Sequence, residues 1–375
     1  MKKKWLWAGL DLGVETASVC IINDGGEVVH SAVCHSSAGD VRRELCRFRR
    51  TRYATVGIEA GMAPQVARGL RNWGYPVQLF EVRQLSKFLR IRRNKTDADD
   101  ALGIAEAGRV GGSLMSRVYL KSFDCQALQA RLAIRKHLIA QRVAISNMLG
   151  RQLEVFGGRL TCKPLSKKRR SLVEAEIRSI FKRGSSEVVS ELRILLDFCE
   201  RLVSYQLAVD RELRLLAEGN DVCRRLMAIP GVGPLCALSF YAAIDDPHRF
   251  GRSTDVGSYF GLAPRLHESG LTVRKSRITK MGNPGVRALL VHAAGMYFRC
   301  APTNSSLRAW TLRLESRRGR LPSRVALARK LAVIMLTLWK RGTHFDPHYV
   351  TYDVTPEAET GLHPIPVREP ALSLA

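Results

Sequence analysis

The order of strand-like and helix-like segments in the first 107 residues constrains the fold more than any other feature of the sequence. Residues 5–13 and 15–24 are β-like runs, and an Asp-Gly-Gly turn leads into a third run at 27–35. These runs predict an antiparallel meander of three strands. Helix and strand patterns then alternate, and they cover residues 38–50, 53–60, 61–74, 76–82 and about 96 to 107. This order predicts a mixed sheet with helices on its faces.

Acidic residues stand at the ends of two predicted strands and at the start of the last helix. Asp11 ends the first strand in G-L-D-L-G, and Glu59 ends a later strand in G-I-E-A-G. Asp97 and Asp100 are three residues apart, so they share one face of a helix. If the two strands are neighbours and the helix packs at their ends, four mutually repelling carboxylates converge. Such a group favours Mg²⁺ or Mn²⁺, and two ions about 4 Å apart stabilise an in-line phosphoryl transfer.

Each acid taken singly has a plainer interpretation. An aspartate at a strand end is often a turn residue, and acids in the first turn of a helix serve the N-cap and the helix dipole. We assign this capping role to Asp99. As a set, the four acids have the layout of an RNase H-like nuclease. Residues 9–29 also resemble the first phosphate loop of the actin-like sugar kinases, but the later motifs that a kinase needs are not recognisable.

Residues 123–218 have a different character. Apolar residues recur at helical spacing over 125–156 and 185–218, and a basic segment at 162–171 separates the two stretches. This pattern predicts two long antiparallel helices that pack as a coiled coil or a bundle. We interpret them as an oligomerisation arm that builds a dimer or tetramer.

Residues 219–342 read as helical pieces joined by glycine-rich loops, and a proline-rich, irregular tail follows at 343–375. The sequence I-P-G-V-G resembles a helix-hairpin-helix turn, in which Gly231 and Gly233 let backbone N–H groups approach a phosphate. A plain connection between two helices is the alternative. Further along, hydroxyls alternate with cations that suit phosphate binding: Arg274, Lys275, Arg277, Lys280 and Arg287. A solvated basic loop is the plainer interpretation of that stretch.

The charge balance narrows the classes of partner. The chain has 60 Lys and Arg against 34 Asp and Glu, a formal net charge of +26 that favours polyanions, nucleic acid before an anionic membrane surface. No apolar run is long enough to span a bilayer, and the short apolar start reaches Asp11, which argues against a signal peptide. The nine cysteines form no C-x-x-C pair. We expect a bacterial, cytoplasmic, nucleoid-associated protein.

The chain resembles the DEDD transposases of insertion-sequence family one-ten, which are relatives of the pilin-gene invertase Piv. The resemblance covers residues 5–340, and its motifs are G-L-D-L-G, G-I-E-A-G, N-K-T-D-A-D-D-A, I-P-G-V-G-P, Y-F-G-L-A-P-R, S-G and R-I-T-K-M-G-N-P-G-V-R-A-L-L-V-H-A-A. It implies an α/β RNase H-like (RuvC-like) domain at 1–122, a helical coiled-coil arm at 123–218, and a mainly α transposase domain at 219–342.

The resemblance also implies residue roles. The DEDD tetrad that binds Mg²⁺ falls on Asp11, Glu59, Asp97 and Asp100. The catalytic serine, which attacks a DNA phosphate and forms a transient phosphoserine link, falls on Ser269. Relatives often carry a run of small hydroxyl residues at this point, whereas Glu268 precedes Ser269 here, so Ser258 and Ser276 are the alternative nucleophiles.

Members of this family use a structured bridge RNA, whose loops pair with target and donor DNA, and their two sites cooperate across subunits. We therefore expect a transposase that excises and inserts its own insertion sequence, with double-stranded DNA, a guide RNA and further copies of itself as partners. Two other classes stay open. One is a RuvC-like endonuclease that hydrolyses nucleic acid while Ser269 is structural, and the other is a non-catalytic nucleic-acid-binding protein.

Overall fold

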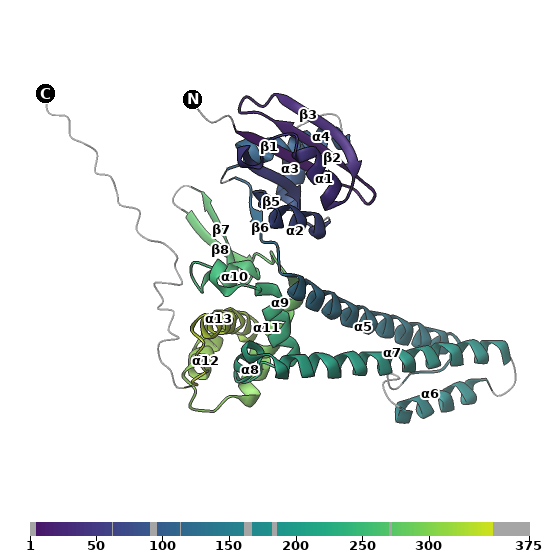
Figure 1. The fold of residues 1–375 in the computed structure, drawn as a ribbon. Helices are drawn as coiled ribbons and strands as arrows, with labels where there is room; N and C mark the ends of the chain where they lie inside the picture. Colours follow the sequence, from purple (N-terminus) through teal and green to yellow (C-terminus); the bar gives the residue numbers. More distant parts are fainter. Residues whose placement is uncertain are drawn as a thin grey trace, which may run out of the picture. The chain divides into compact units, whose positions relative to one another are not determined.

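The computed structural model describes residues 5–61, 63–90, 96–112, 114–160, 167–181, 186–269 and 272–347. The chain divides into two compact units, Met1–Lys121 and Ser122–Ala375 (Figure 1). Within the described ranges, no helix is both long enough and apolar enough to cross a membrane.

A six-stranded mixed sheet forms the centre of the first unit, in the order β3-β2-β1-β4-β5-β6. β1 pairs antiparallel with β2, and β2 with β3, which confirms the predicted meander. β4 lies parallel to β1, and β5 lies parallel to β4. The short β6, which the sequence did not predict, pairs antiparallel with β5. The strands are β1 (Leu6–Leu12), β2 (Thr16–Ile22), β3 (Val28–His35), β4 (Tyr53–Glu59), β5 (Val77–Phe80) and β6 (Arg117–Val118).

Four α-helices accompany this sheet in the described part of the unit, and they are α1 (Ala38–Leu45), α2 (Pro64–Asn72), α3 (Val82–Leu89) and α4 (Asp97–Val110). The predicted helix at 38–50 ends early, and a 3₁₀ turn follows at Arg50–Arg52. α3 was not predicted, because its first residue was assigned to the preceding strand. The strand ends because Glu81 caps α3, its side chain accepting a hydrogen bond from the Gln84 N–H.

The two faces of the sheet are covered by different helices. Leu6, Ala8 and Leu10 of β1 belong to a buried cluster with residues of α1 and α2. Trp7 packs on the opposite face, in a cluster that includes Ala101 of α4. Because successive side chains of a strand point to opposite faces, the odd-numbered residues of β1 face α4.

The second unit begins with two long helices, α5 (Phe123–Val155) and α7 (Ser186–Gly219), which lie side by side in Figure 1. Arg131 pairs with Glu212 at 2.6 Å, and Arg142 donates to the Gln206 side chain at 2.7 Å. Partner numbers fall along α7 as they rise along α5, so the helices are antiparallel, as predicted. Their packing as a coiled coil, and their role as a separate arm, stay predictions.

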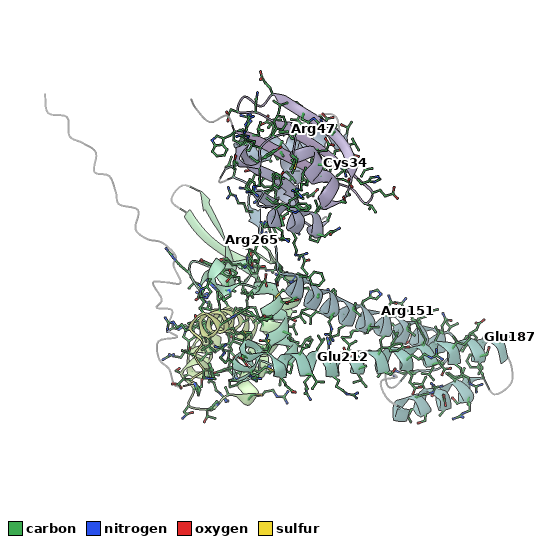
Figure 2. All side chains as sticks on the ribbon, in the orientation of Figure 1. Cys34, Arg47, Arg151, Glu187, Glu212 and Arg265 are labelled. Atoms are coloured by element: carbon green, nitrogen blue, oxygen red, sulfur yellow. The ribbon has the colours of Figure 1, made fainter. Side chains whose placement is uncertain are left out.

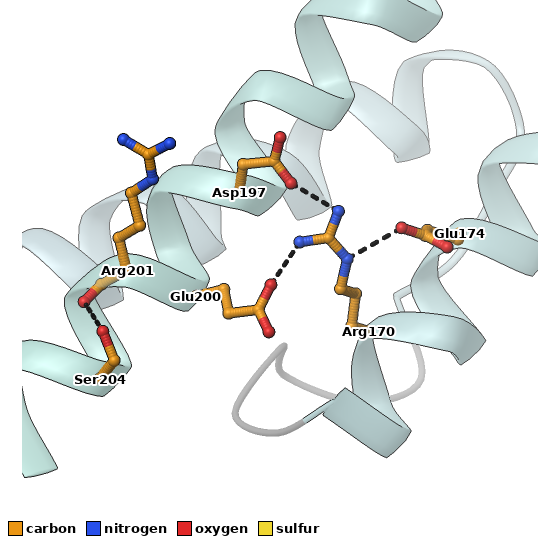
Figure 3. A network of polar contacts seen from close by, with 6 residues as sticks. All are labelled: Arg170, Glu174, Asp197, Glu200, Arg201 and Ser204. Carbon is orange, nitrogen blue, oxygen red and sulfur yellow. Dashed lines mark hydrogen bonds and ion pairs between the residues drawn. The ribbon is translucent and has the colours of Figure 1, made fainter.

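A third helix, α6 (Lys167–Ile180), corrects the expectation of a plain basic connection between the two long helices. Figure 3 shows how Arg170 holds it, with contacts of 2.9 Å to Glu174, 2.5 Å to Asp197 and 2.5 Å to Glu200. The hydrogen bond that Arg170 donates to the Asp197 carboxylate is the largest cause that raises the pKa of Arg170. The three helices also share buried apolar residues, which are Leu149, Leu153, Val173, Ile177, Leu192 and Leu196. Apolar spacing within α6 was the missed signal.

The rest of the unit is mainly helical, as expected. Its α-helices are α8 (Asp221–Met227), α9 (Pro234–Ile244), α10 (Asp255–Tyr259), α11 (Pro284–Cys300), α12 (Ser306–Arg318) and α13 (Arg320–Arg341). They enclose one core, to which α13 contributes fully buried Leu327, Leu331 and Met335. A two-stranded hairpin, β7 (Pro264–Ser269) and β8 (Thr272–Ile278), corrects the expectation of helices and loops alone.

Candidate functional site

Two of the four predicted tetrad positions lie side by side at one end of the sheet. β1 and β4 pair in parallel, with Gly9 opposite Gly57 and Leu10 opposite Ile58. Asp11 and Glu59 are the next residues along these strands. Because neighbouring parallel strands lie about 4.8 Å apart, the Asp11 and Glu59 carboxylates lie near each other at the same end of the sheet.

α4 covers this part of the sheet through contacts that only glycine permits. A Cβ atom on Gly9 would collide with the backbone carbonyl of Ala101 and the backbone nitrogen of Ala105. A Cβ atom on Gly57 would lie 2.6 Å from the Phe80 ring and 3.0 Å from Ile104. The two glycines stand two residues before Asp11 and Glu59, so both acids point to the face that α4 covers.

The direction of α4 brings its first turn to the same end of the sheet. Ala101 lies against Gly9, whereas one Cβ on Gly108, further along α4, would lie 3.2 Å from Thr55 and 3.7 Å from Trp7. The helix therefore runs antiparallel to β1 and β4. Its first turn, which carries Asp97 and Asp100, lies at the carboxyl ends of both strands.

The four positions thus share one edge and one face of the first unit. Asp97 is exposed, whereas Asp11, Glu59 and Asp100 are partly buried. Among the residues that the structure describes, no three His, Cys, Asp or Glu side chains are already arranged to hold a metal ion. The backbone therefore places the four residues at the same edge. To bind a metal ion there, their carboxylates would have to turn toward a common point.

Asp99 has the capping role that the sequence predicted. Thr96 is the N-cap of α4, and its hydroxyl oxygen accepts a hydrogen bond from the Asp99 N–H at 3.1 Å. The same hydroxyl donates to the Asp99 carboxylate at 2.7 Å. This exchange fixes the start of the helix, and with it the positions of Asp97 and Asp100.

Ser269, the predicted nucleophile, is the last residue of β7, and its backbone pairs with Thr272 of β8. Gly270 and Leu271, between the strands, lie outside the described residues, as do the side chains of Ser269, Arg274, Lys275 and Ser276. Of the cations predicted for phosphate binding, Arg277 and Lys280 are exposed, and Ser258 is exposed on α10.

Two family motifs meet at the base of this hairpin. A Cβ on Gly261 would collide with the backbone of Met281, and one on Gly282 would collide with the carbonyl of Tyr259. Both glycines have positive φ, which side chains disfavour. Arg287, predicted for phosphate binding, donates to the carbonyls of Phe260 at 3.0 Å and Met281 at 3.2 Å, so part of its guanidinium holds this base together.

The I-P-G-V-G sequence joins α8 to α9, and its two glycines have different surroundings. Gly231 has φ +85, and its Cβ would lie 2.6 Å from the Ala293 carbonyl of α11, so the turn packs closely on that helix. Gly233 is exposed, and a Cβ there would meet nothing within 4 Å. Close packing on α11 is enough to explain why residue 231 is a glycine. No such contact requires a glycine at position 233, which faces open space at the start of α9.

An RNase H-like sheet with acids at one edge, followed by a mainly helical unit, is the arrangement of a DEDD transposase. Residues 8–156 match the profile of the DEDD transposases of IS110 type, described as "Transposase". Residues 223–308 match the profile described as "Transposase IS116/IS110/IS902 family". The chain belongs to the IS110 family of transposases.

Curated relatives agree with this assignment. The "Transposase for insertion sequence element IS1111A" of Coxiella burnetii is 29% identical over 89% of each chain. The "Probable family 20 transposase" of Pseudomonas aeruginosa is 30% identical over 82% of this chain and 91% of that protein. The "Pilin gene-inverting protein" of Moraxella bovis is 31% identical over 34% of this chain and 40% of its own. These matches confirm the resemblance that the motifs indicated.

Proposed function

We propose that this protein cuts and rejoins double-stranded DNA at the ends of its own insertion sequence, with a carboxylate site for Mg²⁺ and Ser269 as nucleophile. The observation that supports this most strongly is the common edge of the first unit. Two strand ends and the first turn of one antiparallel helix bring Asp11, Glu59, Asp97 and Asp100 to one face.

The donor set of this edge fits Mg²⁺ or Mn²⁺. Carboxylate oxygens are the hard ligands that these ions prefer, and all four acids retain contact with solvent. Mg²⁺, when held here, supplies positive charge that stabilises the phosphate oxygens during strand cleavage. The four carboxylates would hold the ion beside the scissile phosphate, and α4 keeps two of them in place.

Ser269 would act by transesterification. Its hydroxyl loses a proton to a base, its oxygen forms an ester bond with phosphorus, and the bond from phosphorus to one deoxyribose oxygen breaks. That deoxyribose oxygen takes up a proton as it leaves. Attack by a deoxyribose hydroxyl of another strand reverses the sequence, releases Ser269 and rejoins DNA without an outside energy source.

The proposal includes a structured guide RNA that pairs with donor and target DNA. The net charge of +26 suits two polyanionic partners at once. Exposed Arg277 and Lys280, close in sequence to Ser269, are available for phosphates. In this arrangement base pairing reads the sequence, while the protein contacts mainly the backbone.

We also propose self-association through the long helices. Ile194, Phe198 and Tyr205 share one face of α7 and are 65%, 50% and 59% exposed, and Ile134 and Met148 are similarly exposed on α5. A second copy would remove this apolar surface from water. Light scattering of the full chain, with and without nucleic acid, should give a dimer or tetramer, and a monomer in both conditions would refute this part.

The proposed function is tested by recombination in cells. A plasmid carries the gene with its native flanks, and the junction of the excised element is amplified for the wild type, Asp11→Asn, Ser269→Ala and the capping control Asp99→Asn. We expect the wild type and Asp99→Asn to give the junction. We expect no junction from Asp11→Asn or from Ser269→Ala. A junction that persists in Ser269→Ala would remove that serine as nucleophile. DNA cleavage without any junction would favour the hydrolytic endonuclease.

A further inference from the structure

Three hollows on the second unit join into one band around the start of α9. Arg135, Arg211 and Arg214 line the first hollow, together with Pro234 and Leu235. The second hollow contains these same two residues, since residues 231–236 line it with Leu289, His292 and Met296. His292 and Met296 also border the third hollow, which contains Arg299, Arg320 and Arg324. We call this continuous surface the α9 band.

The α9 band is strongly positive. Six arginines line it, and Asp210 is the one carboxylate among the residues that line the three hollows. That carboxylate pairs with Arg135. Within the described ranges, none of the other five arginines forms an ion pair with an acid. Their charges are therefore available to a partner.

One end of the band contains a donor that the described protein does not satisfy. Arg320 and Arg324 are four residues apart on α13 and share a face, and they line the same hollow as Arg299 of α11. The Arg324 guanidinium lies near Gly295 of α11, because a Cβ atom added to that glycine would be 4.0 Å from Arg324 Nη1. Its Nε–H is buried and has no hydrogen-bond partner among the described residues. Because this Nε–H is buried, a ligand in the hollow does not reach it, and the exposed guanidinium groups of Arg299 and Arg320 are the donors open to a phosphate.

We infer that the α9 band holds duplex DNA by its phosphate backbone, an inference that rests on the DNA substrate of the proposed function. The cations occur on both sides of the I-P-G-V-G turn, so one duplex can contact both clusters. The lining residues of the three hollows include no Phe, Tyr or Trp, and His292 is the one aromatic side chain among them on which an unpaired base could stack. They also include no Ser, Thr, Asn or Gln side chain to hydrogen-bond base edges or the 2′-hydroxyls of RNA. Arginine can also contact guanine edges, so the preference for phosphates rests on the excess of positive charge in the band.

Binding of the full chain to a duplex of about 30 base pairs, without Mg²⁺ and at several salt concentrations, tests this inference. The band variant is Arg299→Gln, Arg320→Gln, Arg324→Gln. The control removes the same charge from exposed sites on the long helices, Arg151→Gln, Arg193→Gln, Arg201→Gln, of which Figure 2 labels the first. We expect the band variant to bind about 100-fold more weakly and to lower the salt slope by about 3, since each phosphate contact contributes about 0.9. The control should change affinity less than about threefold.

Circular dichroism and thermal unfolding verify that each variant is folded. If the triple variant is not folded, Arg211→Gln, Arg214→Gln tests the other end of the band and should lower the slope by about 2. An unchanged slope in a folded variant would overturn the inference, as would a loss confined to an RNA duplex or to single strands of the same length.

Failure of this inference is distinguishable from failure of the proposed function. Asp11→Asn should keep full duplex affinity while it loses the recombination junction, because the α9 band does not include the first unit. A band variant that binds DNA normally would leave the carboxylate site and Ser269 untouched as proposals.

Discussion

Both candidate sites stand where strands end, but different neighbours fix them. Asp11 and Glu59 end strands in the middle of the six-stranded sheet, next to residues such as Leu10 and Ile58 that are fully buried. Ser269 ends one strand of a two-stranded sheet, whose described support lies at its base, around Gly261. The comparison teaches that the acidic edge is held by a helix packed across two strands, whereas the described support of the serine's strand is confined to backbone contacts at the base of its hairpin.

The largest effect is expected at Gly9, where sheet and helix touch. Gly9→Val places a side chain against the backbone of Ala101, so α4 must move away from the strand ends. We expect a loss of about 3 kcal/mol in the free energy of unfolding and loss of the recombination junction. Urea unfolding of the full chain measures the first effect, and the cellular assay measures the second.

Gly39→Val is the matched control for that change. Gly39 lies in the first turn of α1, and the nearest atom to its Cβ is the Ser37 hydroxyl oxygen at 3.9 Å. The free energy of unfolding of the Gly39 variant should differ from that of the wild type by less than about 1 kcal/mol. Equal stability of the Gly9 and Gly39 variants would contradict the close packing of α4 on β1.

The base of the hairpin should be the next most sensitive place. Gly261→Ala puts a Cβ at φ +67 against the Met281 backbone, and we expect a loss of about 2 kcal/mol. Hydrogen exchange should show faster opening of β7 and β8, while the strands of the first unit keep their protection. Gly233→Ala, with no atom within 4 Å of the new Cβ, should stay within about 1 kcal/mol of the wild type. Uniform loss of protection in both units would contradict local support of the hairpin.

A smaller effect is expected at the cap of α4. Thr96→Ala removes the hydroxyl that accepts from the Asp99 N–H, which should cost about 1 kcal/mol, while Thr96→Ser should restore most of it. Junction formation should fall more in Thr96→Ala than stability alone explains, because the same turn carries Asp97 and Asp100. Comparing the denaturant midpoint of each variant with its junction yield tests whether the loss of junction exceeds the loss of stability. Unchanged yield in Thr96→Ala would mean that the cap does not position the acids.

The smallest effect is a pH dependence of stability at α1. The hydrogen bond between His30 and Glu44, at 2.8 Å, is the largest cause that lowers the pKa of Glu44, and Arg47 adds to it. The stabilisation is therefore present above the ordinary value of 4.5 and is lost as pH falls through the lowered folded pKa. Glu44→Gln should be about 1 kcal/mol less stable near pH 6, with the difference vanishing toward pH 3. A difference in melting temperature that is constant over this range would contradict the linkage.

Local patterns predicted the elements that have strong periodicity. The meander of β1 to β3 and the antiparallel α5 and α7 follow from periods of 2 and 3.6 residues, and the capping role of Asp99 follows from its place in the first turn of a helix. The hairpin β7–β8 was missed because its strands are rich in basic and hydroxyl residues, which hide the alternation of a two-stranded ribbon. Helix α6 was missed because its first residues are a run of cations.

The sequence by itself determined the family, the meander of β1 to β3, the two long helices and the strand-end positions of Asp11 and Glu59, because these depend on motifs and on neighbours along the chain. The tertiary structure alone decided that α4 runs antiparallel to β1, so that its first turn reaches the same edge. It alone also gathered the arginines of the α9 band, which come from α5, α7, α11 and α13. Packing between distant segments produces both features, and no local pattern encodes the distance between residues on different helices.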